Sequence, residues 1–265
     1  MKVAAAQTHP RFGQPEENRL ITRRFCRRAA QQDVRLIVFP ELCITGYNFS
    51  SKKALVRLAE PVPNGPTTQL WLNLAKAHRL IIVGGLAELD DKGQIFNSAV
   101  VVGPKGFLGC YRKLHLFGSE WELFSAGNQI PQVHSVLGFK FGAIVCFDWA
   151  FPELARILML EGCEVLCHPS NLVLPLAQRV MIARSIENRL FTITANRVGT
   201  ERDLQFTGRS QIISPSGDIL VRGRSRRSQL LITEINPAEA RNKNITPTNN
   251  LITDRRVKLY KRLIS

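Results

Sequence analysis

Residues 141–153 of the chain read FGAIVCFDWAFPE. The apolar run before Cys146 predicts a buried strand that ends at the cysteine. Pro152 suits the first turn of a helix, because the N–H that proline lacks would have no partner there. A thiol between a strand and a helix lies close to backbone N–H groups that favour negative charge. The stretch therefore predicts a nucleophilic cysteine at this junction.

The rest of the chain alternates between apolar runs and segments of helical periodicity. Strands are expected at residues 2–8, 34–39, 80–86, 97–102, 141–146, 164–168, 191–196, 209–214, 218–221 and 229–235, and helices at residues 16–32, 67–78, 152–161 and 175–190. Residues 111–124 lack a clear period and are expected to be irregular. Strands that alternate with helices early, and hairpins late, predict one α/β domain with mixed sheets over residues 1–265, in which residues from about 236 to 265 form a polar, basic C-terminal arm.

The composition is that of a globular domain. Of the 265 residues, 45% are hydrophobic and 22% are charged, which is enough to bury a large core. No apolar run reaches the ~20 residues of a membrane helix, and Met1 and Lys2 lead directly into the first strand with no room for a signal peptide. We therefore expect a cytoplasmic protein whose six cysteines are reduced thiols.

The net charge of +15 is unusually basic and is compatible with a surface that attracts anionic substrates, nucleic acid or membrane headgroups. A nucleic-acid-binding module is the main non-enzyme hypothesis. It depends on this charge and on the cluster of Arg222, Arg224, Arg226 and Arg227. A solvated arginine-rich surface is the simpler interpretation, because the cluster follows a Pro-Ser-Gly turn and is expected to be an exposed loop.

Glu41, Lys113 and Cys146 lie at the ends of buried strands or just beyond them. A carboxylate in a half-dry site can act as a base and then as an acid, a charged lysine can stabilise an oxyanion, and a cysteine near that lysine is biased toward thiolate. Together they supply what acyl transfer through a thioester needs. Taken singly, Glu41 fits a surface turn, Lys113 an amphipathic surface side chain, and Cys146 a small buried apolar residue.

Three segments carry a family resemblance: FPELCITGY at 39–47, YRKLHLF at 111–117 and VCFDWAFPE at 145–153. They resemble, in order and spacing, the three signature motifs of the nitrilase superfamily of carbon–nitrogen hydrolases. Shorter matches extend the resemblance over nearly the whole chain: NSA at 97–99, FSAG at 124–127, HPSN at 168–171, ENR at 187–189, ANRVG at 195–199, GRS at 208–210 and IISPSG at 212–217. One departure is the SAG at 125–127, where relatives often have proline before the glycine.

The resemblance implies an αββα sandwich that pairs through a helical face into dimers or larger assemblies. It implies Cys146 as the nucleophile, Glu41 as the general base and Lys113 as the stabiliser of the tetrahedral intermediate, with no metal or organic cofactor. Glu120 stands where family members carry a second glutamate, and Glu122 is the alternative. Further contacts to the oxyanion or the substrate are expected from the backbone N–H of Phe147 and from Tyr47, Trp149 and Asn171.

The residues after the cysteine bear on substrate choice. Phe147 and Asp148 resemble the amidase and carbamoylase branches rather than the true nitrilases, which tend to have Trp-Glu there. Trp149 and Ala150 stand where branches that bind substrate carboxylates often have arginine, so an N-carbamoyl amino acid or ω-amide is less favoured. The leading hypothesis is that the substrate is a small aliphatic or aromatic amide, bound in an apolar pocket lined by Trp149 with Leu172 or Leu174. A nitrile remains the close alternative, because the same Phe-Asp-Trp order resembles some archaeal-type members assigned nitrile activity.

Two other sites are less favoured. Cys163, Cys167 and His168 are close in sequence, but neighbouring residues of a strand point to opposite faces, which argues against a metal site. A Cys146–His168 dyad of the thiol-protease kind would leave Glu41 and Lys113 without roles.

Overall fold

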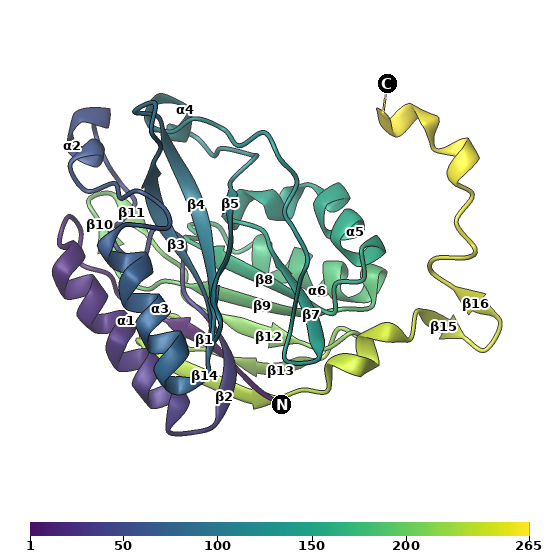
Figure 1. Ribbon diagram of the computed structural model, residues 1–265. Coiled ribbons are helices and arrows are strands. Elements are labelled where there is room, and N and C mark those ends of the chain that lie inside the picture. Colours follow the sequence, from purple (N-terminus) through teal and green to yellow (C-terminus); the bar gives the residue numbers. More distant parts are fainter. Residues whose placement is uncertain (265) are drawn as a thin grey trace.

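The computed structural model describes residues 1–264 as two six-stranded sheets packed face to face, with helices on both outer faces (Figure 1). The first sheet has the order β14-β1-β2-β3-β4-β5, formed by β1 (Lys2–Gln7), β2 (Val34–Val38), β3 (Ile81–Leu89), β4 (Ile95–Gly103), β5 (Gly106–Arg112) and β14 (Gln229–Glu234). The second has the order β13-β12-β9-β8-β7-β6, formed by β6 (His134–Val136), β7 (Phe139–Ala143), β8 (Val165–Ser170), β9 (Phe191–Asn196), β12 (Gln211–Ile213) and β13 (Ile219–Arg222).

Both sheets are mixed. In the first, β1, β2 and β3 are parallel neighbours, and in the second β7, β8 and β9 are parallel; the remaining pairs are antiparallel. Parallel strands need long crossovers, and these are made by α1 (Pro15–Ala30), α3 (Pro66–His78), α5 (Pro152–Leu160) and α6 (Ala177–Asn188). The smaller elements are α2 (Lys52–Val56), α4 (Glu120–Leu123), β10 (Thr200–Glu201), β11 (Leu204–Gln205), β15 (Asn244–Thr246), β16 (Asn249–Asn250) and the 3₁₀ turns η1 (Cys146–Ala150), η2 (Pro237–Arg241), η3 (Val257–Leu259) and η4 (Lys261–Ile264).

Three apolar layers hold the sandwich together. The inner layer joins the facing sides of the two sheets, for example Leu36 and Val83 with Phe141 and Ile193. One outer layer packs α1 and α3 on the first sheet, with the fully buried Trp71 at its centre. The other packs α5 and α6 on the second sheet. This arrangement confirms the predicted αββα sandwich with mixed sheets.

Three local predictions needed correction. The strand expected to end at Cys146 is β7, which ends at Ala143, and Cys146 begins η1 instead. The φ angle of Cys146 is +41°, a left-handed value that an extended strand cannot include. Residues 106–112 form the edge strand β5, missed because two glycines and a half-exposed face weaken its apolar pattern. Residues 120–123, expected to be irregular, form the short helix α4.

The chain after β14 divides into a packed part and a projecting part. Within η2, Ala240 is fully buried in the inner layer, and the Lys243 ammonium donates to the carbonyls of Asn188 and Arg189 at the end of α6, at 2.9 Å each. Residues 244–264 extend away from the sandwich (Figure 1). The final position of the expected arm, Ser265, lies outside the described residues.

Candidate active site

Glu41 lies just beyond the end of β2, in a turn packed against β3. The backbone N–H of Gly85 donates to the Pro40 carbonyl at 3.1 Å, and the Cys43 N–H donates to the Gly85 carbonyl at 3.0 Å. A Cβ atom on Gly85 would lie 2.5 Å from the Glu41 Cα, so this close approach requires glycine. The turn thereby carries the fully buried Glu41 to the end of the neighbouring strands.

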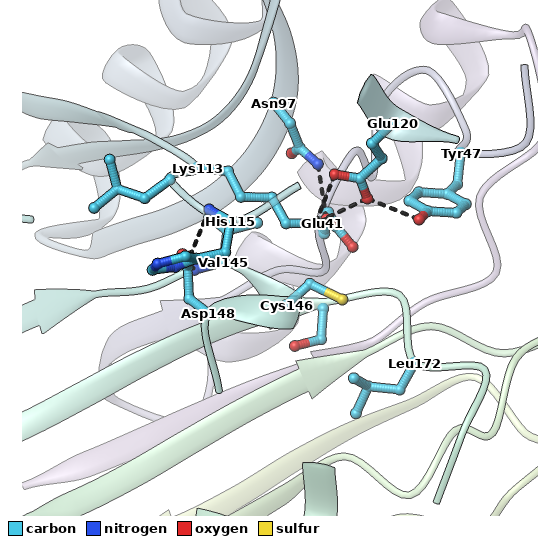
Figure 2. A network of polar contacts seen from close by, with 12 residues as sticks. Glu41, Tyr47, Asn97, Lys113, His115, Glu120, Val145, Cys146, Asp148 and Leu172 are labelled. Carbon is cyan, nitrogen blue, oxygen red and sulfur yellow. Dashed lines mark hydrogen bonds and ion pairs between the residues drawn. The ribbon is translucent and has the colours of Figure 1, made fainter. Parts of the chain in front are cut away.

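Lys113 lies between two carboxylates, as Figure 2 shows. Its Nζ atom is 2.8 Å from Glu41 Oε1 and 2.8 Å from both oxygens of Glu120, and its side chain has no exposed surface. Burial alone lowers the pKa of Lys113, but the two carboxylates outweigh burial and raise that pKa above its ordinary value. Lys113 is therefore a fixed buried cation at neutral pH.

Each carboxylate has a second polar partner. The Asn97 amide donates to Glu41 Oε1 at 2.7 Å, and the Tyr47 hydroxyl donates to Glu120 Oε1 at 2.7 Å. Glu41 Oε2 is buried without a hydrogen-bond partner among the described residues. Glu122, the alternative to Glu120, is exposed on α4 and stands outside this cluster. The structure thus brings Glu41, Lys113 and Glu120 together and leaves one oxygen of Glu41 available.

The loop that carries Tyr47 is held from a distant part of the chain. Glu201 Oε2 accepts from the backbone N–H groups of Tyr47 and Asn48 at 2.8 and 2.9 Å, and Glu201 also forms an ion pair with the fully buried Arg197. Both residues follow β9, and Glu201 lies 154 positions after Tyr47. The motif at 195–199 gives no indication in the sequence that this region contacts the Tyr47 loop.

Cys146 lies beside this cluster (Figure 2) and is only 5% exposed. Burial raises the pKa of its thiol well above the ordinary value, the Glu41 charge raises it further, and the Lys113 charge opposes both. The resting side chain is therefore a neutral thiol. Lys113 lowers the pKa of the thiol, as expected, but burial and the surrounding carboxylates outweigh this one ammonium group.

His168 contacts the backbone of Cys146 rather than its sulfur. Its Nε2 atom is 2.9 Å from the Cys146 carbonyl oxygen, which can only accept a proton, so Nε2 carries the hydrogen. Its Nδ1 atom is 3.1 Å from the Thr194 hydroxyl. Burial lowers the pKa of His168 to about 4, so the ring is neutral and supports the Cys146 turn. This geometry does not fit a Cys146–His168 dyad.

Asp148 connects the cysteine turn to the lysine segment. Its Oδ2 accepts from the Val145 N–H at 2.9 Å and from the Tyr111 hydroxyl at 2.8 Å. Its Oδ1 contacts His115 through the backbone N–H at 3.2 Å and the ring Nδ1 at 2.8 Å. Asp148 is fully buried by these contacts. The interpretation of Asp148 as a residue of substrate choice is therefore replaced by a role in aligning the two motifs.

A small pocket opens at Cys146. It encloses about 30 Å³ and is lined by Phe117, Cys146, Phe147, Trp149, Asn171, Leu172, Val173 and Leu174. No ionisable side chain other than the thiol is part of this lining. Both polar atoms of the buried Asn171 side chain lack a hydrogen-bond partner among the described residues. Phe147, Trp149 and Asn171 line this pocket, whereas Tyr47 contacts Glu120.

The loop that departs from the family pattern still packs on the lysine segment. The Gly127 N–H donates to the Lys113 carbonyl at 2.9 Å, and the Ser125 N–H donates to the Ile95 carbonyl at 2.8 Å.

Among residues 1–264, no group of three or more His, Cys, Asp or Glu side chains is arranged to hold a metal ion. The same part of the chain contains no helix with the length and apolarity needed to cross a membrane.

The sequence pattern of the carbon–nitrogen hydrolase family matches residues 2–244. The chain belongs to the carbon–nitrogen hydrolase family. A nitrilase of Pyrococcus abyssi is 41% identical to it, over 98% of this chain and 99% of the relative. The 2-oxoglutaramate amidase of Bacillus subtilis is 30% identical, over 90% of this chain and 92% of the relative.

Solved structures of carbon–nitrogen hydrolases share the fold. An amidase from Nesterenkonia sp. superposes with a TM-score of 0.82 at 24% identity, over 99% of this chain and 96% of the other. The chain is therefore an enzyme of this family with the family's sandwich fold, and the buried cluster around Cys146 lies at the end of the sandwich strands.

Proposed function

We propose that this enzyme hydrolyses a small primary amide to a carboxylic acid and ammonia through a thioester on Cys146. The observation that supports this most directly is the buried cluster in which Glu41, with one free carboxylate oxygen, and the cation Lys113 adjoin a neutral thiol. A neutral thiol needs a base at the moment of attack, and an amide carbonyl needs positive charge where its oxygen becomes anionic.

The proposed reaction proceeds in two stages. Glu41 takes the proton of Cys146 as the sulfur bonds to the amide carbon, and Lys113 with the Phe147 N–H holds the oxyanion. The Phe147 N–H is suited to this, because the first N–H groups of a helical turn have no partners within the turn. Glu41 returns the proton to the nitrogen, the C–N bond breaks and ammonia leaves. Glu41 then takes a proton from water as the water oxygen bonds to the thioester carbon. The C–S bond breaks, the acid leaves, and Glu41 returns the proton to the sulfur of Cys146.

Glu120 and Tyr47 complete the proposed machinery by holding Lys113. Burial raises the pKa of Glu120 and the Glu41 charge raises it further, while Lys113 opposes both. Burial and Glu120 also raise the pKa of Tyr47, so that its hydroxyl remains a donor. Asn171 is assigned to the substrate, because its unpartnered amide group lies in the pocket lining.

The lining favours an acyl group that is small and uncharged. Phe117, Trp149 and Leu172 are apolar, and no arginine or lysine of the lining could pair with a substrate carboxylate. An ω-amide or an N-carbamoyl amino acid is therefore a less suitable substrate, although the Bacillus subtilis relative is named for an ω-amide of a dicarboxylic acid.

A nitrile is the second candidate substrate. The most similar of the relatives described above is named a nitrilase. A nitrile carbon could be attacked by the same thiol, and two waters would convert it to the same acid and ammonia. An ammonia-release screen with matched pairs, such as propionamide and propionitrile or benzamide and benzonitrile, separates the two. Succinamic acid and N-carbamoylglycine test the carboxylated classes.

Faster turnover of the amide in each pair would support the proposed amidase activity. Turnover of the nitriles alone would show that the enzyme is a nitrilase instead. Glu41→Gln and Cys146→Ala variants serve as controls for contaminating activity. Ammonia release from no compound of the screen, by a folded wild-type protein, would contradict both.

We further propose that the enzyme is a cytoplasmic homodimer or larger assembly in which the C-terminal arm lies on a partner subunit. The residues of the arm that support this are apolar and exposed, namely Ile245, Ile252, Val257, Leu259, Tyr260 and Leu263. A chain ending at Lys243 keeps the buried contacts of that lysine and removes the rest of the arm. Sedimentation velocity should show an assembly for the full chain and a smaller or weaker one for the truncated chain. A monomeric full chain would contradict the proposal.

A further inference from the structure

A second pocket, of about 410 Å³, adjoins the substrate pocket and shares Val173 with it. Three segments form its wall: the loop that leads into α6 together with the start of that helix, residues 205–209, and the end of β13 with the turn that follows. The lining contains four arginines and no carboxylate; the arginines are Arg179, Arg209, Arg222 and Arg226. The proposed reaction uses none of them.

The positive charge of this pocket is not neutralised by the protein. None of the four arginines takes part in an ion pair among residues 1–264, and all four are exposed to solvent. Arg209 and Arg222 line the same pocket, and the pKa of Arg222 is lowered by partial burial and then by the charge of Arg209. Like charges gathered in a concave wall attract counter-ions of opposite sign.

One of the arginines is held in place beside a helix start. Gln211 Oε1 accepts from Nε and Nη2 of Arg222, at 3.0 and 2.7 Å. The amide nitrogen of the same Gln211 donates to the carbonyl of Gln178, in the first turn of α6, at 2.7 Å. The 12-residue α6 carries no acidic residue in that turn, so the positive end of its dipole adds to the arginine charges.

We propose that this pocket binds a compact polyvalent oxyanion, that is, a small molecule with several phosphate or carboxylate groups. Guanidinium groups suit both kinds of oxygen, because their paired N–H donors match either geometry. The concave shape and the convergence of three segments favour a small ligand over a nucleic acid. Arg224 and Arg227, on the same turn, are not part of the lining.

Isothermal titration at constant ionic strength, with inorganic pyrophosphate and with citrate as probes, tests the proposal. Saturable binding near one equivalent per chain by either probe is expected. Binding of pyrophosphate alone would identify a phosphate-containing ligand, and binding of citrate alone would identify a carboxylate ligand. Binding of both would show that the pocket recognises the oxyanion chemistry that the two probes share. An Arg209→Gln/Arg226→Gln variant should bind at least ~tenfold more weakly, which is about 1.4 kcal/mol.

The matched control is Arg23→Gln/Arg27→Gln on the exposed side of α1, which removes the same charge far from the pocket in sequence and should bind as wild type does. Circular dichroism melting establishes that both variants fold. Cys146→Ala should also retain binding, so that failure of the hydrolase proposal would not affect this one. Three results would overturn it: no saturable binding, equal weakening in both arginine variants, or displacement of the probes by a DNA oligonucleotide with higher affinity.

Discussion

Replacing Lys113 by methionine removes the cation that lies between Glu41 and Glu120 without greatly changing the volume of the side chain. Both carboxylates are buried, and the Lys113 nitrogen lies 2.8 Å from each. Breaking a buried ion pair from one side costs about 3–5 kcal/mol, because the remaining charge has lost its partner. For a domain of this size the loss corresponds to a melting temperature lower by roughly 6–20 °C.

The deficit should also depend on pH. Without Lys113, burial and the neighbouring Glu41 charge hold the pKa of Glu120 above that of the unfolded chain, so the folded state binds protons more tightly than the unfolded state does. The variant therefore loses stability relative to wild type as pH rises through the pKa of Glu120. The difference in free energy of unfolding between the two proteins should be smaller at pH 5 than at pH 8. Ammonia release should be abolished at both values.

Urea unfolding followed by circular dichroism at pH 5 and pH 8 measures the effect. A Lys113→Met/Glu120→Gln variant removes the cation and one carboxylate together, and should recover part of the stability but none of the turnover. Lys92→Met, at an exposed turn, is the control for loss of a lysine. Wild-type stability of Lys113→Met would show that the two buried carboxylates do not depend on this cation, and wild-type turnover would exclude a catalytic role for Lys113.

Three further substitutions test the surroundings of the site. In Asp148→Asn, the side-chain NH₂ replaces one of the two oxygens that accept hydrogen bonds, so that some of the present donors would face another donor. The free energy of unfolding should fall by about 1–3 kcal/mol and turnover should decrease. An unchanged urea midpoint would argue against the role of Asp148 in aligning the two segments. Glu201→Gln should loosen Tyr47 and lower kcat by roughly tenfold, about 1.4 kcal/mol, with KM little changed; a pure KM effect would contradict this. The pKa of His168 is lowered to about 4, so the neutral ring contributes its full stabilisation above pH ~6.5, and about 3 kcal/mol of the free energy of unfolding is lost as pH falls toward 4. His168→Gln should make this decline less steep in urea unfolding. An equally steep decline in the variant would exclude His168 as its source.

Apolar runs and helical periodicity predicted one α/β domain with mixed sheets. The three motifs that contain Glu41, Lys113 and Cys146 carried the resemblance that implied the αββα layers and the grouping of these residues. Apolar strands such as β2 and β9 have nearly the expected bounds, since buried parallel strands are continuous hydrophobic runs. Strand ends then bring residues that are far apart in sequence to one place. The family and the αββα sandwich were confirmed, whereas the catalytic roles stay predictions.

The features that the sequence did not reveal depend on contacts between distant segments. The hydrogen bond from Tyr47 to Glu201 spans 154 positions, and no periodicity in the sequence indicates it. The neutral state of the Cys146 thiol depends on the relative sizes of the effects of burial, Glu41 and Lys113 on its pKa. These sizes depend on distances and burial, which the sequence does not contain. Asp148 is adjacent to the reaction centre in sequence, yet it faces Tyr111 and His115.

The central claim is that Cys146 carries the acyl group during turnover. Acid quenching of the enzyme during hydrolysis of an active amide, followed by mass spectrometry of the proteolytic peptide that contains Cys146, measures this directly. The peptide should be heavier by the acyl group, and hydroxylamine should release the adduct. Cys146→Ala should carry no adduct and release no ammonia. An adduct on another residue, or ammonia release by Cys146→Ala at the wild-type rate, would contradict it.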